Sequence, residues 1–417
     1  MAEQFTLKEL KDAVAGNAAA FRCRRRLQPA GGEGDKVFPP TFAGAVYAVE
    51  QRRLPGRDAP VSCVLLDSVQ SQANRMELAL QEAVDAGKIE LPLVEVDFSK
   101  HGPTGDVEAD EEAGRLVDAV GKITSLQVPH RLADAILRDS ELDGVLFRQS
   151  ETGKALNTVS LANATPVFEL CPTALLFGMW DSTGPKGGLG PKFERAMVSE
   201  IVGIGAEVGD LLRGVRRDPL EIRAAVKVHK SADGSWQVSD PKAKGVVSPS
   251  AINHSSVPYP KHPDRKTEDN HYAGATIEYA EQTTTLSLIC LRRLRFPLNG
   301  KSGDATDLAA CTVLAALGLC GATLAFEGGA GLRSRSLLWP DGPMVWELLQ
   351  RPGSPPRAFE LTSAQAVKLL NEAIVAARQN GLIWRKEPVV LRPSAELLKL
   401  VRLSQLQATK EATEGEA

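Results

Sequence analysis

The chain has 417 residues and is 43% hydrophobic, which is enough to bury a large core in one elaborated domain or in two or three ordinary ones. Its 49 Lys and Arg residues face 52 Asp and Glu residues, and this balance excludes a protein that coats nucleic acid through a uniformly basic surface. Charges interrupt the N-terminal residues, no apolar run approaches the length that spans a bilayer, and the six cysteines are scattered, so we expect a cytoplasmic protein with buried thiols and no membrane contact.

The first expected strand, at 18–27, carries a cluster of arginines. Side chains alternate along a strand, so Arg22, Arg24 and Arg26 share one face, and Arg25 points to the other. A flexible glycine loop follows the strand. This basic arm within an acidic chain predicts a local surface for a polyanion.

A short buried strand at 61–66 leads directly into a helix. Asp67 is expected to cap this helix, because its carboxylate can accept hydrogen bonds from the first turn, and Gln70 follows three residues later. The opposite side from the apolar stripe is polar, and a helix start favours an anion, although an ordinary amphipathic helix with a solvated face has the same pattern. The polar residues that could contact an anion here are Ser68, Gln70, Ser71, Asn74 and Arg75.

The middle of the chain first continues the alternation of strands and helices and then breaks it. Strands are expected at 91–98 and 144–147, with part of a helix at 131–138 between them. Residues 177–270 contain several glycines, an expected helix at 193–202, and a stretch rich in proline and histidine. We interpret this region as an insertion that projects from the sheet.

The later part of the chain returns to long elements. Strand-like runs at 276–293 and 323–326 flank an expected helix at 304–319. A helix at 363–380 and a short helix near 395–402 follow. Strands and helices in this order predict an α+β fold, in which helices cover a sheet.

The segment 326–335, FEGGAGLRSR, combines glycines with two arginines. Glycines allow a backbone to approach a bulky anion, and arginines hold an anion through a fork of N–H donors. The segment lacks the Gly-Lys-Ser/Thr end of a P-loop and is followed by another strand, so it predicts a phosphate-backbone clamp rather than an ATP site. A glycine hairpin between two edge strands, with solvated arginines, would have the same sequence. The clamp residues are Gly328, Gly329, Gly331, Arg333 and Arg335.

Patterns for catalysis or metal binding are weak. Asp35 and Asp304 lie near basic segments, but no two carboxylates have the spacing of a two-metal site. The spacing of His254, His262 and His271 matches no standard zinc site, and no Gly-x-Ser-x-Gly elbow appears. We therefore expect no catalytic residue, no metal and no cofactor. From the residues alone, a soluble α+β enzyme with an anion site stays an alternative.

Three motifs together resemble a known family: RCRRRLQP from Arg22 with DKVFPPT from Asp35, DSVQSQANR from Asp67, and the segment 326–335. They are similar to the backbone subunit of the type I-G (formerly I-U) CRISPR interference complex, Cascade, which is the Cas-seven group of the RAMP superfamily. The resemblance covers most of 21–335. It implies an RRM-like (ferredoxin-like) palm with large insertions that form a thumb and fingers.

On this resemblance the chain divides into five parts. They are a first palm part with finger-like loops at 1–176, an inserted thumb and finger region at 177–270, a second palm part with the clamp at 271–345, a C-terminal helical region at 346–408, and a disordered acidic tail at 409–417.

The resemblance implies a subunit that binds the guide RNA (crRNA) in antiviral defence. Copies polymerise along the guide as a helical filament and leave its bases free to pair with a target DNA strand, so base pairing reads the sequence and protein reads the backbone. The implied partners are crRNA, target DNA, further copies of the chain and other Cascade subunits.

The same resemblance assigns roles to particular residues. Lys36 and the three arginines on one face of the first strand would contact phosphates, together with the polar residues of the helix start and the clamp. Met179 and Trp180 would form a thumb tip that wedges between bases, although Trp180 could instead anchor the core of the insertion. Some RAMP relatives cut RNA with a loop aspartate, so a metal-dependent nuclease that uses Asp35 or Asp304 is the alternative function.

Overall fold

The computed structural model describes residues 5–43, 46–184, 187–210, 218–231, 234–254 and 272–414. The chain forms two compact units. Unit 1 comprises 1–100, 120–208 and 274–397, and unit 2 comprises 101–119, 209–273 and 398–417.

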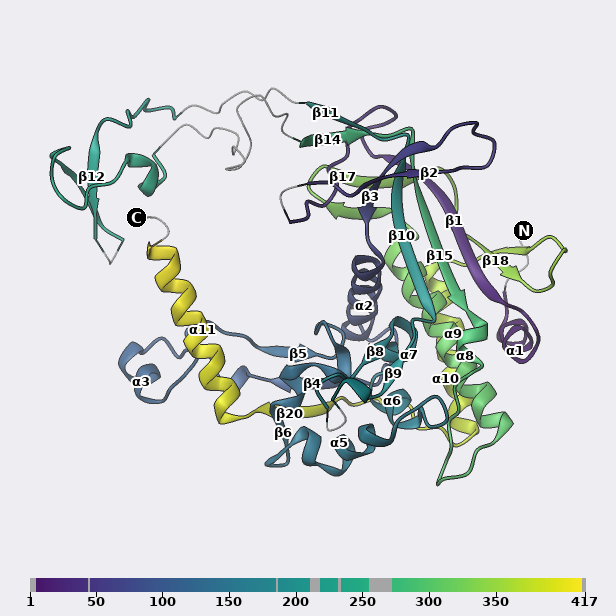
Figure 1. The fold of residues 1–417 in the computed structure, drawn as a ribbon. Helices are drawn as coiled ribbons and strands as arrows, with labels where there is room; N and C mark the ends of the chain where they lie inside the picture. Colours follow the sequence, from purple (N-terminus) through teal and green to yellow (C-terminus); the bar gives the residue numbers. More distant parts are fainter. Residues whose placement is uncertain are drawn as a thin grey trace. The chain divides into compact units, whose positions relative to one another are not determined.

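Unit 1 is built on an antiparallel sheet with the strand order β16-β17-β1-β15-β10-β3-β2. Strand β18 also pairs with β1 and with β19. Figure 1 shows β1, β15 and β10 side by side. The strands are β1 (Ala20–Pro29), β2 (Val49–Arg52), β3 (Val61–Asp67), β10 (Met197–Ile204), β15 (Tyr279–Ser287), β16 (Ala330–Arg333), β17 (Ser336–Pro340), β18 (Val345–Leu349) and β19 (Arg357–Glu360).

The centre of unit 1 has the chain order strand, helix, strand, strand, helix, strand. These elements are β1, α2 (Val69–Asp85), β10, β15, α9 (Asp304–Phe326) and β17. Across the sheet, the last of these strands lies next to the first, followed by the third and the second. This is the order of ferredoxin-like and RRM-like folds, and the expected α+β palm is confirmed.

Strand β1 alternates as the sequence predicts. Phe21, Cys23 and Leu27 are buried on the side that faces the helices, whereas Arg22 and Arg24 lie on the open side. Period-two alternation is the geometric reason, because successive side chains of a strand leave opposite faces of the sheet.

Helix α9 is the central core helix of unit 1. It is long and apolar enough to cross a membrane, so the expectation that no apolar run reaches that length is wrong. However, 83% of its most apolar stretch is buried inside the protein. It packs against α2, against α1 (Leu7–Ala15) and against α10 (Ser363–Gln379), which explains why it has no polar face.

Three expected elements differ from the structure. The expected helix at 193–202 is instead strand β9 (Lys192–Phe193) and strand β10, whose buried and exposed residues alternate at its start. The expected strand at 323–326 is the last turn of α9, where the Thr323 hydroxyl donates to the Leu319 carbonyl. The long run at 276–293 breaks where Ser287 caps the short helix α8 (Leu288–Leu291).

Smaller elements complete unit 1. A second sheet has the order β5-β4-β20-β6-β7, in which β20 and β4 are parallel. Its strands are β4 (Val94–Asp97), β5 (Lys122–Thr124), β6 (Ser140–Leu142), β7 (Val145–Leu146) and β20 (Val389–Pro393). Short helices include α4 (Ala135–Arg138), α5 (Glu151–Ala155), α6 (Thr165–Leu170) and α7 (Thr173–Phe177), and a hairpin pairs β8 (Met179–Trp180) with β9.

Unit 2 contains part of the expected insertion. Its elements are α3 (Val107–Glu112), the hairpin of β12 (Lys227–Lys230) and β13 (Trp236–Ser239), and most of α11 (Ala395–Glu414). Helix α11 continues well past the expected end at 402 and covers 409–414, part of the segment predicted to be disordered, because Ala, Lys and Glu favour a helix. Of the three histidines considered for a metal, His262 and His271 lie outside the described residues, as do 415–417.

Candidate nucleic-acid interface

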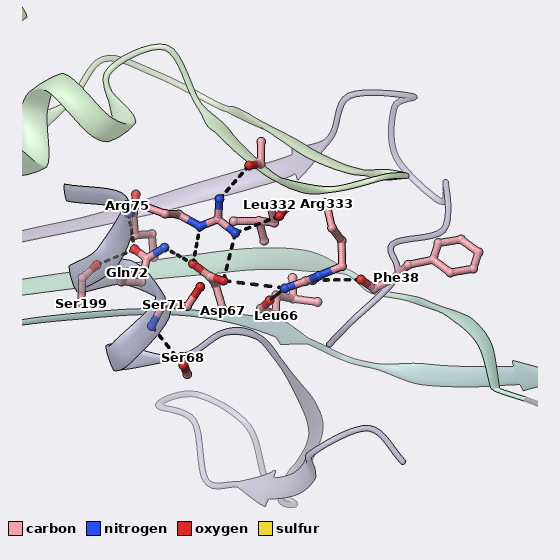
Figure 2. Close-up of polar contacts among 12 residues, drawn as sticks. Phe38, Leu66, Asp67, Ser68, Ser71, Gln72, Arg75, Ser199, Leu332 and Arg333 are labelled. Carbon is pink, nitrogen blue, oxygen red and sulfur yellow. Dashed lines mark hydrogen bonds and ion pairs between the residues drawn. The ribbon is translucent and has the colours of Figure 1, made fainter. Parts of the chain in front are cut away.

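Three segments that the sequence analysis singled out meet in the fold: the loop around Lys36, the start of α2, and residues 328–336, which we call the glycine–arginine hairpin. Arg75 on α2 donates through Nη1 to the Gly331 carbonyl at 3.0 Å and through Nη2 to the Leu332 carbonyl at 2.8 Å. Arg75 and Gly331 are 256 residues apart in the chain. Tertiary structure therefore gathers motifs that are distant in sequence into one place (Figure 2).

Asp67 is the anchor of this region. It is only 1% exposed and ends strand β3, where it accepts from Gln72 Nε2 at 2.5 Å and from Arg75 Nε at 2.9 Å. The Arg333 guanidinium approaches from the other side at 3.7 Å (Figure 2). A buried carboxylate requires such partners, because burial removes its hydration.

The expectation that Asp67 caps α2 is wrong. Ser68 is the cap, and its hydroxyl accepts from the Ser71 backbone N–H at 3.3 Å. Ser68 is one residue closer to the helix, which leaves the Asp67 side chain in the strand and directed toward the hairpin. The side chains of Gln70 and Asn74 are exposed at the start of the same helix.

Gln72 is a member of the site that the sequence analysis missed. Its amide nitrogen donates to Asp67, while its amide oxygen accepts from Ser199 Oγ at 2.8 Å and from Gln282 Nε2 at 3.0 Å. The signal was the helical spacing, because Gln72 lies between Val69 and Ala73 on the side of α2 that faces the core. An amide at a buried helical position needs polar partners in the sheet.

Arg333 and Arg75 hold the protein together rather than pointing freely outward. Arg333 donates to the Phe38 carbonyl at 2.9 Å and to the Leu66 carbonyl at 3.0 Å. Burial lowers the pKa of Arg333, although the nearby Asp67 carboxylate acts in the opposite direction. The side chains of Arg75 and Arg333 are 27% and 28% exposed, so both are partly accessible to solvent.

Arg335 and Lys36 have a different environment. Arg335 lies in the hairpin turn with a φ of 60°, and its guanidinium is stacked 4.4 Å from the centre of the Phe38 ring. Arg335 is exposed and Lys36 is half-buried. Within the described ranges, no carboxylate lies within ion-pair distance of either side chain. Both positive charges therefore remain without a salt-bridge partner there.

Only one of the three clamp glycines is required by the backbone. Gly329 has a φ of 110°, and a Cβ there would lie 2.6 Å from the Leu338 carbonyl oxygen. A Cβ on Gly328 would meet nothing within 4 Å, and one on Gly331 would make an ordinary contact with Leu337. Glycine is thus required at 329, where the chain enters β16, whereas a side chain could be accommodated at 328 and 331.

The arginines on the open face of β1 are mostly neutralised. Arg22 pairs with Glu347 at 2.7 Å, and Arg24 pairs with Glu281 at 2.6 Å, whose hydrogen bond raises the pKa of Arg24. Arg26 differs, because its guanidinium lies 4.2 Å over the Tyr279 ring, and no ion pair joins it to another described residue.

Met179 and Trp180, the two residues expected at a thumb tip, differ in their exposure to solvent. Met179 is 8% exposed, so it belongs to the core of its hairpin. Trp180 is 52% exposed, and the Lys192 ammonium lies 5.4 Å from its ring centre. Of the two, Trp180 alone presents a surface that could meet a base.

The two aspartates of the nuclease alternative lie in exposed positions. Asp35 accepts from the Lys36 backbone N–H at 2.8 Å in its loop, and Asp304 is the first residue of α9. Across the part of the chain with described coordinates, no group of three His, Cys, Asp or Glu residues could hold a metal ion.

Part of the chain is similar to a known protein family. Residues 21–208 match the family described as CRISPR-associated protein GSU0053 (Cas_GSU0053). Over this stretch, which is somewhat less than half of the chain, the protein is similar to CRISPR-associated proteins. The match includes β1, the loop with Lys36, Asp67 and helix α2, and it confirms the resemblance at family level, in agreement with a RAMP-type subunit. No curated protein matches the chain. The family match supports a role in CRISPR defence.

Proposed function

We propose that this protein is the crRNA-binding backbone subunit of a type I-G Cascade effector complex in the cytoplasm. In this role, copies polymerise along the guide, contact other Cascade subunits and leave bases free to pair with a target DNA strand. The observation that carries the proposal is the excess of positive charge on the segments that meet at Asp67. The buried carboxylate pairs with Arg75 and Arg333, while Arg335 lies over the Phe38 ring and Lys36 is two residues before Phe38 in the chain.

The geometry favours recognition of the RNA backbone. Arg335 and Arg26 lie against aromatic rings, which orients each guanidinium and leaves its N–H donors available for phosphate oxygens. Phosphate contacts carry no sequence information, as a subunit that must accept any guide requires. The chain is only 5% aromatic, which argues against stacking on an aromatic platform as the main mode of binding.

A local patch is sufficient for an acidic chain to bind RNA. The net charge is -3, but polyanion binding depends on the potential of the surface that faces the ligand. Arg22 and Arg24 contribute less to this potential because each has its own glutamate. We therefore rank Arg335, Lys36 and Arg26 above them as phosphate contacts.

The proposal is tested by the nucleic acid that the protein carries. The wild-type protein, expressed with a guide, is expected to purify as a large oligomer with RNA of discrete length. Lys36→Gln with Arg335→Gln should reduce the bound RNA and flatten the salt dependence of binding. The matched control is Arg22→Gln with Arg24→Gln, which also removes two positive charges but from neutralised positions. Protein that stays monomeric and free of RNA when guide is supplied would overturn the proposal.

We also propose that the subunit is not catalytic. The test is incubation of the RNA-loaded protein with complementary RNA or DNA in magnesium or manganese, followed by sizing of the products. Intact strands are expected. Regularly spaced cuts that disappear in Asp35→Ala or Asp304→Ala would instead establish the RAMP-type nuclease.

A further inference from the structure

Arg25 is the arginine of β1 that points away from the open face, and it is the most buried cation of that strand. It is 6% exposed and lies between the sheet and helix α9. Its Nη1 donates to the carbonyl of Phe326, the last residue of α9, at 2.8 Å. Its Nε and Nη2 are buried without a hydrogen-bond partner among the described atoms.

A buried guanidinium needs a negative partner, and here the partner is a helix end. No carboxylate of the described chain forms an ion pair with Arg25, and burial lowers the pKa of its guanidinium. The C-terminal end of a helix carries partial negative charge, because its last carbonyls have no partner within the helix. The Phe326 carbonyl also accepts from the Gly329 backbone N–H at 3.0 Å, so Arg25 caps α9 from outside as a second donor and stabilises the place where that helix ends.

The end of α9 is also the start of the glycine–arginine hairpin. Only Glu327 separates Phe326 from Gly328, and Gly329 then directs the chain into β16. Arg75 holds the following carbonyls, those of Gly331 and Leu332. The stretch 326–332 is thus held at its two ends by arginines that donate to backbone oxygens, and the exposed Arg335 follows three residues after Leu332.

We propose that Arg25 is a positioning residue for the RNA contact of the hairpin, in particular for the phosphate contact of Arg335. This inference rests on the proposed function. Arg25 itself is too buried to touch RNA. It acts by holding the carbonyl end of α9, so that the hairpin begins at a fixed point and Arg335 meets a phosphate.

The test uses fluorescent poly(U) as the probe and measures its affinity and salt dependence for the folded full-length protein. Arg335→Gln should weaken binding about tenfold and reduce the salt slope by about one contact. Arg25→Met should give a similar loss even at temperatures well below its melting transition. The double variant should lose little more than Arg335→Gln alone, because both changes remove the same contact.

Controls separate positioning from general destabilisation. Arg25→Lys keeps a cationic donor for the Phe326 carbonyl and should restore most of the affinity. Arg138→Met removes an arginine that lies outside the proposed interface, where it pairs with Asp139 at 2.7 Å, and this control should bind as the wild type does. If Arg25→Met fails to fold, the Arg25→Lys and Arg25→Gln variants are used in the same cycle, and the one without the charge should bind more weakly.

Each result decides one claim. If Arg335→Gln leaves poly(U) binding unchanged, the proposed interface fails. If Arg335→Gln weakens binding but folded Arg25→Met binds as the wild type does, only the positioning role is overturned. Additive losses in the double variant would also overturn it, because Arg25 would then act on a separate contact.

Discussion

Arginines lie both on the open face of β1 and around the glycine–arginine hairpin, but their electrostatic environments differ between the two places. On β1, Arg22 and Arg24 each have one glutamate, at 2.7 Å and 2.6 Å. At the hairpin, Arg75 and Arg333 share the single carboxylate of Asp67, and Arg335 is stacked on a ring instead. The positive charge that remains after arginines have paired with carboxylates, rather than the number of arginines, therefore indicates where a polyanion binds.

Removal of the shared carboxylate should have the largest effect. Asp67→Asn would leave two guanidinium groups close together beside a buried amide, so we expect a loss of about 3 kcal/mol in the free energy of unfolding. Urea denaturation of the purified protein measures this loss. Glu33→Gln, in an exposed loop, is the control and should change the unfolding free energy by less than about 0.5 kcal/mol. Equal stability of the two variants would mean that Asp67 does not anchor the region.

A methyl group at the hairpin entry should have an intermediate effect. Gly329→Ala places a Cβ 2.6 Å from the Leu338 carbonyl oxygen at a φ of 110°, and we expect it to cost about 1–3 kcal/mol. Gly328→Ala is a matched control, since its Cβ would meet nothing within 4 Å. Thermal unfolding of the two variants, side by side, checks the difference. A loss in the control as large as in Gly329→Ala would show that the strain argument is wrong.

Removal of the glutamate that pairs with Arg24 should have the smallest effect. Glu281→Gln removes the carboxylate that neutralises Arg24 and should free a positive charge on the open face. If this face lies along the RNA, poly(U) affinity should rise a few-fold and the salt slope should steepen by up to about one contact. Titration of poly(U) at several salt concentrations measures both. An unchanged slope would place the open face of β1 away from the RNA.

The sequence was sufficient for patterns that are local. The alternation of β1 placed Arg25 opposite Arg22, Arg24 and Arg26, and the order of strands and helices predicted the α+β palm. Both follow from periodicities that a few neighbouring residues determine. Buried thiols were also predicted, and five of the six cysteines are buried, whereas Cys290 is half-buried. Burial raises the pKa of Cys23, Cys311 and Cys320 to about 12.

The sequence was insufficient where a partner is distant. Asp67 after a strand and before a helix is typical of a cap, and its partner Arg333 is 266 positions later in the chain. Nothing local distinguishes an arginine that is paired across the fold from one that is free. In the same way, the run at 323–326 was expected to be a strand, but packing of α9 among three helices extends the helix through it.

The separation of these partners has a consequence for synthesis of the protein. The Asp67 anchor joins β3 to a hairpin 267 residues beyond Leu66, so the cationic surface closes only when residues up to Ser336 have left the ribosome. Contacts of such long range form late in folding, because a large loop must close first. A nascent chain therefore contains its basic strand long before the other parts of the proposed interface, which can assemble only after residues up to Ser336 have been synthesised.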